Sequence, residues 1–174
     1  MGTKIAINRV VNAVLYADGN SMLGKAEEIT LPDLKAKMAA HKSLGTVGEI
    51  ETFSGFEKLT GKIKMTSYYK DALVKFANVF KPVQLQARAS MQVHEAGGVV
   101  REVPVVCLVT ATFNKFPFGA LKQHDNPEIE FEYGATYVKL VIDGQDVLEY
   151  DVLANIYKVD GVDLLADYRL NTGA

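Results

Sequence analysis

The sequence contains little cysteine and no long hydrophobic run. Cys107 is the single cysteine among 174 residues, which excludes an intrachain disulfide and a metal site built from several cysteines. Its apolar neighbours in residues 105–109 predict that Cys107 is a small buried hydrophobic residue. The longest apolar runs, residues 103–109 and 137–142, have the length of a strand and fall well short of the ~20 residues that a membrane-spanning helix needs.

An excess of charge of one sign is also missing. The 19 basic and 21 acidic residues leave a net charge of −2 and are interspersed along the chain, which argues against a basic nucleic-acid reader or a polybasic membrane binder. With 48% hydrophobic and 23% charged residues, the chain has the composition of a globular protein. A chain of this length buries roughly 70% of its unfolded surface around one core, so we expect a single domain over residues 1–174.

Recognisable catalytic and metal-binding motifs are missing too. Residues 19–25 match a phosphate-binding loop until Ala26, which stands where serine or threonine would hold magnesium. A hairpin turn explains this segment better. The three histidines, His41, His94 and His124, have no second ligand nearby at metal-binding spacing. The sequence therefore predicts no catalytic residue, no metal and no cofactor.

Alternation of apolar and polar residues is the dominant pattern. It is strict in residues 83–93, where every odd position is apolar and every even position polar, and this is typical of a strand with one face on a core. A turn at residues 95–98 predicts an antiparallel partner in residues 99–112. A second alternating run begins at Ile129 and ends at the hairpin signal Asp143-Gly144.

Weaker patterns complete the expected fold. Residues 10–16 and Asp18-Gly19 indicate another hairpin, and residues 50–56 and 59–66 suggest a third. Helical spacing occurs over residues 69–80, and a short C-terminal helix is expected to begin at Asp163 as its N-cap. The sequence predicts a mainly β, antiparallel β-sandwich or barrel-like fold with one main α-helix (about 69–80) and a short C-terminal helix.

Several segments together resemble a known family. They are ITLPDL at residues 29–34, Lys37, Gly45, LVIDGQDVLEYD at 140–151, KVDGVD at 158–163 and RLNTG at 169–173. In this order they are similar to the major tail tube proteins of contractile-tailed phages. Residues 113–127 depart from the family pattern.

The resemblance implies a non-enzymatic structural subunit. Six copies would form a homohexameric ring, and rings would stack into the rigid inner tube of a contractile tail, the conduit for DNA ejection into the host. The implied partners are further copies of the chain, the tail sheath protein, baseplate and tail terminator proteins, and phage DNA that passes through the lumen without specific binding; no membrane anchor is implied. The implied location is the virion, after assembly in the host bacterial cytoplasm.

Two sets of residues are candidates for contacts in such a tube. Residues 40–61 are too apolar for a solvated loop and too rich in glycine to be stable alone, which indicates ring stacking. The stacking candidates are His41, Leu44, Val47, Phe53 and Phe56. The polar face of residues 83–93 is expected to line the lumen, or alternatively to form the outer surface beneath the sheath. Its members are Gln84, Gln86, Arg88, Ser90 and Gln92.

Other functions remain open at this point. The same family pattern occurs in the tubes of headless contractile bacteriocins and, in fold, in secretion-like injection systems. From a different class, a small β-barrel module could bind a ligand in its cavity. Self-assembly into a filament would separate the first group from the second.

Overall fold

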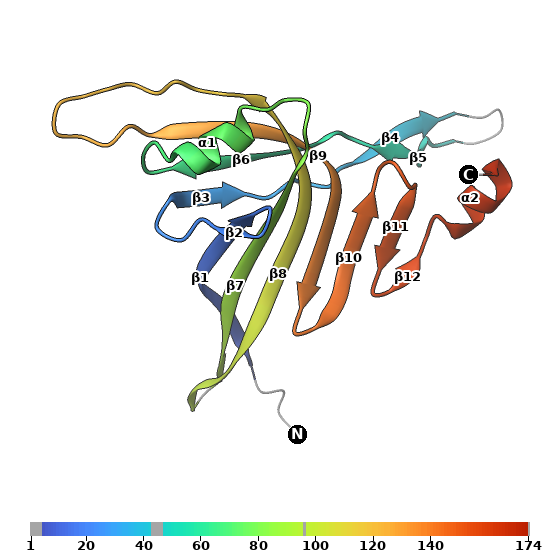
Figure 1. Cartoon of the computed structure of the whole chain (residues 1–174). Coiled ribbons are helices and arrows are strands. Elements are labelled where there is room, and N and C mark those ends of the chain that lie inside the picture. Colours follow the sequence, from blue (N-terminus) through green and yellow to red (C-terminus); the bar gives the residue numbers. More distant parts are fainter. Residues whose placement is uncertain (1–4, 43–46, 96, 174) are drawn as a thin grey trace.

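The computed structural model describes residues 5–42, 47–95 and 97–173, and strands dominate its architecture (Figure 1). The antiparallel β fold expected from the sequence is confirmed. Within the described residues, the elements follow in the order β1 (Ile7–Ala17), β2 (Asn20–Ser21), β3 (Ala26–Thr30), β4 (Ala36–His41), β5 (Ile50–Phe56), β6 (Leu59–Met65), α1 (Lys70–Phe76), β7 (Val83–Glu95), β8 (Gly98–Lys115), β9 (Ile129–Ile142), β10 (Gln145–Asp151), β11 (Ile156–Val159), β12 (Val162–Asp163) and α2 (Ala166–Thr172). None of these helices reaches the length and hydropathy of a membrane span.

Strand β9 is the junction of the main sheet. Along one edge it pairs with β8. Along the other edge its first half pairs with β6, at 129–135, and its second half pairs with β10, at 137–142. The described part of the sheet therefore runs β12-β11-β10-β9-β8-β7-β1-β2, while β6 and β3 branch from the first half of β9. Figure 1 shows the branch curving over the upper ends of β7 and β8, together with α1.

The hairpin turns form where the sequence predicts them. Asp143 and Gly144 have φ of 53° and 77°, and Asp18 and Gly19 have φ of 48° and 78°. Two consecutive positive φ values are the geometry of a type I′ turn, which matches the twist of the strands that it joins. The turns connect β9 with β10 and β1 with β2, both antiparallel.

The core lies between the branch, α1 and the inner faces of the long strands. Phe76 of α1 stacks on Phe113 of β8, with ring centroids 4.1 Å apart, and meets Phe131 of β9 at 5.2 Å. These rings lie among the most deeply buried side chains, with Ile63 and Met65 of β6. Cys107 is buried among them, as the sequence predicts. The alternation in β6 to β9 thus places one apolar face of each strand on a common core.

Both helices differ in extent from the expected ones. Helix α1 ends at Phe76, and its expected continuation is exposed, with Phe80 94% accessible. Ala77 forms the C-cap, its amide donates to the Leu73 carbonyl, and the chain turns at residues 79–80 before Pro82. Helix α2 begins at Ala166 without a side-chain cap. Asp163 instead accepts a hydrogen bond from the amide of Leu165.

One predicted hairpin is wrong. Strands β5 and β6 have nearly the expected bounds, yet they do not pair with each other. β6 alternates Leu59, Ile63 and Met65 into the core and pairs with β9 and β3, whereas β5 is mostly exposed and pairs with β4. The strand with alternating apolar residues, β6, therefore packs on the core, and β5 pairs with β4 instead.

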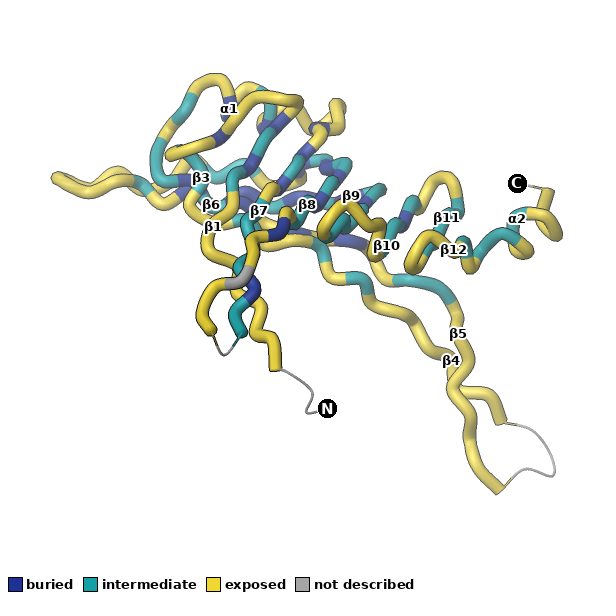
Figure 2. Tube along the Cα trace, turned by 90° about the horizontal axis from the view of Figure 1, so that it is seen from below, coloured by how far each residue is buried: buried dark blue, intermediate teal, exposed yellow. Residues whose placement is uncertain are grey.

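Two extensions leave the body of the subunit. The β4–β5 hairpin projects to one side, and Figure 2 shows it exposed along nearly its whole length. On the other side, residues 116–128 form a long loop, drawn at the upper left of Figure 1. Phe116 anchors this loop on Phe131, with ring centroids 5.4 Å apart, and the Tyr68 hydroxyl donates a hydrogen bond to the Phe118 carbonyl.

The close packing of β6 against β9 predicts a strong effect of one methyl group. A Cβ on Gly61 would lie 2.4 Å from the Tyr133 ring and 2.6 Å from the Thr30 carbonyl oxygen, which the Tyr133 hydroxyl hydrogen-bonds at 3.0 Å. We therefore expect Gly61→Ala to lower the free energy of unfolding by about 1–3 kcal/mol. Gly48→Ala is the matched control, because nothing lies within 4 Å of its added Cβ. Equal thermal unfolding of the two variants would contradict this packing.

Candidate functional site

The polar residues of β7 share one face of the main sheet. Gln84 and Arg88 are exposed, and Gln86, Ser90 and Gln92 are half-buried. The alternation places Val83, Leu85 and Ala87 on the core side, which is the division that the sequence predicts. We call the five polar residues and their neighbours on the same side of β8 to β11 the polar face.

Hydrogen bonds with β8 hold several of these side chains. Gln84 Oε1 accepts a hydrogen bond from Thr110 Oγ1 at 3.0 Å. Ser90 Oγ and Gln92 Nε2 both donate to the carboxylate of Glu102, at 2.9 and 2.8 Å. The two donors lower the pKa of Glu102, so that it stays ionised. Sequence reasoning missed Glu102, although its position on the partner strand follows once the β7–β8 register is known.

The polar face continues onto β9, β10 and β11. The Tyr137 hydroxyl donates to Glu149 at 3.1 Å, and Lys158 donates to the other oxygen of that carboxylate at 3.2 Å. Burial, together with the hydrogen bond to Glu149, raises the pKa of Tyr137 to about 12. Lys139 pairs with Asp146 at 2.7 Å. Asp146 and Glu149 thus each pair with a lysine, so negative and positive charges on this surface lie side by side.

A second, more strongly charged face covers β3, β6 and the first half of β9. Lys62 lies 2.9 Å from Glu130, and Lys115 lies 2.6 Å from Glu132. Lys64 contacts both Glu27, at 3.4 Å, and Glu128, at 3.3 Å. Glu130 and Glu132 therefore belong to a solvated ion-pair network. We call this surface the charged face.

The ring-stacking candidates divide between the tip and the base of the β4–β5 hairpin. His41 and Val47 are exposed near the tip, and Leu44 lies outside the described residues. Phe53 is 53% accessible and touches Phe56 edge-on, with ring centroids 5.0 Å apart. Phe56 packs on Tyr150 and Tyr157 of the body, at 4.7 and 5.0 Å, and so anchors the base of the hairpin.

The glycine-containing segment before β3 is a turn, as the sequence predicts. Lys25 does not stand free for a phosphate, because it pairs with Asp71 of α1 at 2.9 Å and lies 5.5 Å from the Tyr69 ring centroid. The pair lowers the pKa of Asp71. Among the described residues, no three His, Cys, Asp or Glu side chains gather at metal-binding distance.

Assembly is accordingly expected to be independent of nucleotide and metal. Lys25→Ala removes one exposed ion pair, which contributes about 0–1 kcal/mol to stability, and we expect it to polymerise like the wild type. Polymerisation is measured by light scattering in the presence of EDTA, with and without ATP. Polymerisation that requires ATP and that is abolished by Lys25→Ala would contradict the interpretation of this segment as a turn.

Burial also governs the single thiol. Desolvation raises the pKa of Cys107 to about 11, and its side chain points into the core. The thiol therefore stays protonated near neutral pH and is unsuited to nucleophilic or metal chemistry. The Cys107 side chain contributes to the packing of the hydrophobic core.

The comparisons with known proteins converge on one family. The family model of phage tail tube protein FII matches residues 7–173. The chain is 25% identical to the tail tube protein of Escherichia phage P2 over 163 residues, covering 91% of this chain and 93% of that protein. It is 26% identical to the major tail tube protein of Serratia phage KSP20 over 155 residues, covering 88% of each chain.

A solved structure supports the fold. A chain in the sheath–tube complex of an extracellular contractile injection system, the PVC complex in its extended state, superposes with a TM-score of 0.55 and 9% identity. The match covers 74% of this chain and 87% of the other. With the family match extending from the first residues of β1 to the end of α2, the chain belongs to the phage tail tube protein FII family.

Proposed function

We propose that this chain is the structural subunit of a contractile-tail tube, in which six copies close into a ring and rings stack into a rigid conduit for DNA. The observation that carries the proposal is the family match over residues 7–173. The fold is suited to such a role, because much of its strand edge and of its hairpin surface has no partner within the described part of one subunit.

Open strand edges support ring formation. The first half of β1 pairs with β7 along one edge only, and Ile7, Val10 and Val11 are more than half exposed. At the opposite end of the described sheet lies β12, a strand of 2 residues. A long exposed edge with apolar side chains promotes uncontrolled pairing in a monomer, whereas in a closed ring each edge meets a neighbouring copy.

The β4–β5 hairpin is assigned to stacking between rings. Isolated two-stranded ribbons are at best marginally stable in water, and this ribbon projects from the body with Phe53 and Ile50 more than half exposed (Figure 2). A neighbouring ring would cover these side chains. Phe56 would serve as the fixed base from which His41, Val47 and the tip reach the next ring, with Leu44 as a further member of the set.

The polar face is assigned to the lumen and the charged face to the outside of the tube. A wall along which DNA slides must avoid a strong cationic stripe, because every neutralised phosphate releases counterions and adds affinity. Arg88 is the one cation among the five lumen candidates, and Lys139 and Lys158 on the same face are paired with carboxylates. Such a wall would pass DNA without holding it.

The remaining partners follow from this assembly. We propose contacts with a tail sheath protein on the outside and with baseplate and tail terminator proteins at the two ends, a location in the virion, assembly in the host cytoplasm and no enzymatic role. A tube of a headless bacteriocin or of an injection system is the second candidate, favoured by the fold match to a sheath–tube complex.

Electron microscopy of the purified protein in negative stain tests the proposal directly. Rings, or tubes built from rings, are the expected result. A protein that stays monomeric at high concentration would overturn it. Phage particles with and without DNA, purified from the producing strain and probed with antibody against this chain, would separate a phage from a headless particle.

A further inference from the structure

A recess separates the base of the β4–β5 hairpin from helix α2. Its volume is about 470 Å³, within the range of roughly 300–1,000 Å³ that is typical of binding cavities. The side chains that line it are mainly aromatic or aliphatic, and they include Phe53, Phe56, Tyr150, Leu165 and Tyr168. Phe53 and Tyr168 are more than half exposed. Such a surface is suited to apolar side chains that come from outside the subunit.

Both walls of the recess are held in place within the subunit. At the hairpin base, the Phe56 ring packs on Tyr150, with centroids 4.7 Å apart. At the other wall, Arg169 of α2 donates to the Asn155 carbonyl at 2.7 Å and to the Asp163 carboxylate at 2.5 Å. The recess is therefore preformed, which lowers the entropic cost of filling it.

The long loop at residues 116–128 exposes two large apolar side chains. Phe118 is 84% accessible and Leu121 is 83% accessible. The body of the subunit holds the start of this loop, since Phe116 packs on β9 and the Tyr68 hydroxyl donates to the Phe118 carbonyl. Large apolar side chains that an anchored segment presents to solvent indicate a contact with a partner.

The loop and the recess lie on opposite sides of the subunit. Both are in the upper part of Figure 1, the loop at the left and the recess at the right, between the base of β5 and α2. A closed ring of identical copies requires a heterologous contact, in which one surface of each copy meets a different surface of the next copy. The positions of the loop and the recess satisfy this requirement.

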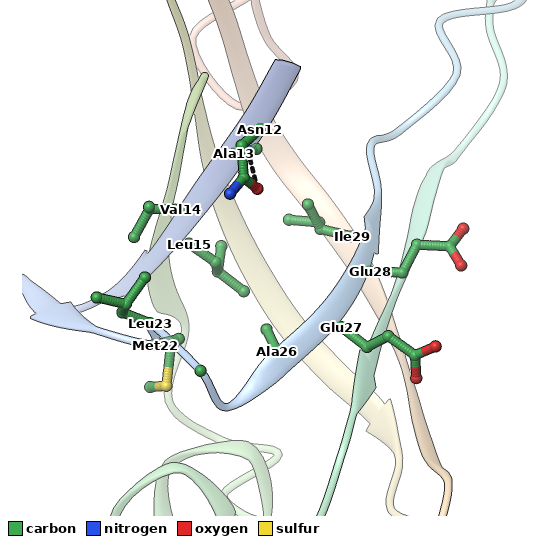
Figure 3. A pocket seen from close by; sticks show the side chains of 11 residues that line it. Asn12, Ala13, Val14, Leu15, Met22, Leu23, Ala26, Glu27, Glu28 and Ile29 are labelled. Carbon is green, nitrogen blue, oxygen red and sulfur yellow. Dashed lines mark hydrogen bonds between the residues drawn. The ribbon is translucent and has the colours of Figure 1, made fainter. Parts of the chain in front are cut away.

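Another hollow of the subunit does not satisfy it. The groove between β1 and β3 has a volume of about 310 Å³, and Leu15 and Ile29 line it from its two sides (Figure 3). β1 and β3 lie on the same side of Figure 1 as the loop. In a ring, the loop of the next copy would arrive at the opposite side of the subunit, where the recess is.

The charges beside the loop tip and the recess have opposite signs. Residues 116–124 contain Lys122 and no acidic residue. Asp167 is exposed in the first turn of α2, next to Tyr168 of the recess. With Leu121 in the recess, Lys122 would come close to this acidic turn. Opposite charges at the rim of a contact favour the correct partner and orientation.

We propose that Phe118 and Leu121 of each copy enter the recess of the next copy in the same ring. The inference rests on the proposed hexameric ring and names one of the contacts that close it. Residues 113–127 depart from the family pattern, so this contact would distinguish the chain within its family.

Cysteine crosslinking tests the contact. Leu121→Cys places a thiol on the loop and Ser54→Cys places one at the recess, both at exposed positions, so we expect folded subunits. Cys107 is buried and reacts slowly. We expect a short bismaleimide to link rings of the double variant into a ladder of covalent oligomers that ends at six chains. Either cysteine alone should give only single chains in denaturing electrophoresis.

Leu121→Cys with Leu23→Cys is the matched control, because Leu23 is exposed and lines the groove of Figure 3. This pair should give no ladder. The inference is overturned by a ladder from the control, or by rings of the double variant that do not crosslink. A ladder that continues beyond six chains would also overturn it, because the loop would then meet a copy in another ring.

Truncation of the loop side chains measures the strength of the contact. For Phe118→Ala with Leu121→Ala, we expect the protein concentration needed for ring formation to rise at least about tenfold, because apolar anchors in a recess carry much of the binding energy. Val99→Ala, an exposed site on the β7–β8 hairpin, is the control. Rings of the loop variant at the wild-type concentration would contradict the inference.

Failure of the proposed function has a different signature. Wild-type protein that forms no rings overturns both proposals. Wild-type rings that persist unchanged in the truncated variant, or that give no ladder in the cysteine variant, overturn only the contact between the loop and the recess.

Discussion

A chain whose β4–β5 hairpin is cut to its base is expected to fold and to form rings, but not to elongate into tubes. The design replaces residues 39–52 with Asn-Gly. Met38 and Phe53 are cross-strand partners, so a two-residue type I′ turn joins them without changing the register. The anchor Phe56 and its contacts with Tyr150 and Tyr157 are retained.

We expect elongation to be almost completely lost while folding is kept, because the removed segment has little role within the subunit. β4 is exposed throughout, and the described residues of the core cluster include none from 39–52. Folding should therefore be maintained, with a thermal unfolding midpoint within a few degrees of that of the wild type. Stacking would lose His41, Leu44 and Val47 together with the outer half of β4.

Size-exclusion chromatography and electron microscopy measure the result. Single rings or short oligomers, with no tubes at concentrations at which the wild type polymerises, are expected. Gly48→Ala serves as the control inside the same hairpin, because its added methyl meets only open space. Tubes of normal length from the shortened chain would show that stacking uses another surface.

How much the sequence reveals depends on whether a strand borders the core. In β7 the alternation of Leu85 and Ala87 with Gln84 and Gln86 marks both the strand and its two faces. The hairpins at Asp18-Gly19 and Asp143-Gly144 are equally predictable, since few residue pairs tolerate positive φ at two successive positions. Local chemistry suffices in these places.

Pairing across the sheet is harder to predict, because it depends on competition between strands. The two residues between β5 and β6 suggest a hairpin, but β6 brings Leu59 and Ile63 to the core beside β9. β4, rich in alanine and lysine, has no period that identifies it as a strand in isolation. Only the three-dimensional structure shows that β4 pairs with β5 and that its side chains are exposed instead of packed on the core.

The polar face shows the same division between local and long-range information. Its five members on β7 follow from alternation. Glu102, which binds Ser90 and Gln92, and Glu149, which binds Tyr137, come from strands whose register no local pattern specifies.

Adding positive charge to the polar face is expected to slow DNA ejection while leaving the tube intact. The most informative change is Gln84→Lys together with Gln86→Lys. Ser90 and Gln92 are less suitable, because both donate to Glu102 and a lysine there would be neutralised by that carboxylate. Arg88 is left as it is.

The expected magnitude follows from repetition around the ring. Two lysines per copy give about twelve new charges in each hexameric ring, and phosphate neutralisation makes the affinity for DNA grow steeply with the number of contacts. We expect ejection to slow severalfold at low salt and to recover as the salt concentration rises, since the added affinity comes from counterion release. The subunit should stay folded, because Gln84 is exposed and Gln86 is only half-buried.

Gln84→Glu with Gln86→Glu is the matched control, because it alters the same positions without attracting phosphate. Ejection from reconstituted particles is followed by the fluorescence of a dye that binds released DNA, and tube and sheath are inspected in the same samples. Slow, salt-sensitive ejection from the lysine variant alone would place the polar face in the lumen. Normal ejection combined with loss of the sheath from the lysine variant would place this face on the outside of the tube and transfer the lumen to the charged face, where Lys62 and Lys64 are already matched by Glu130 and Glu128.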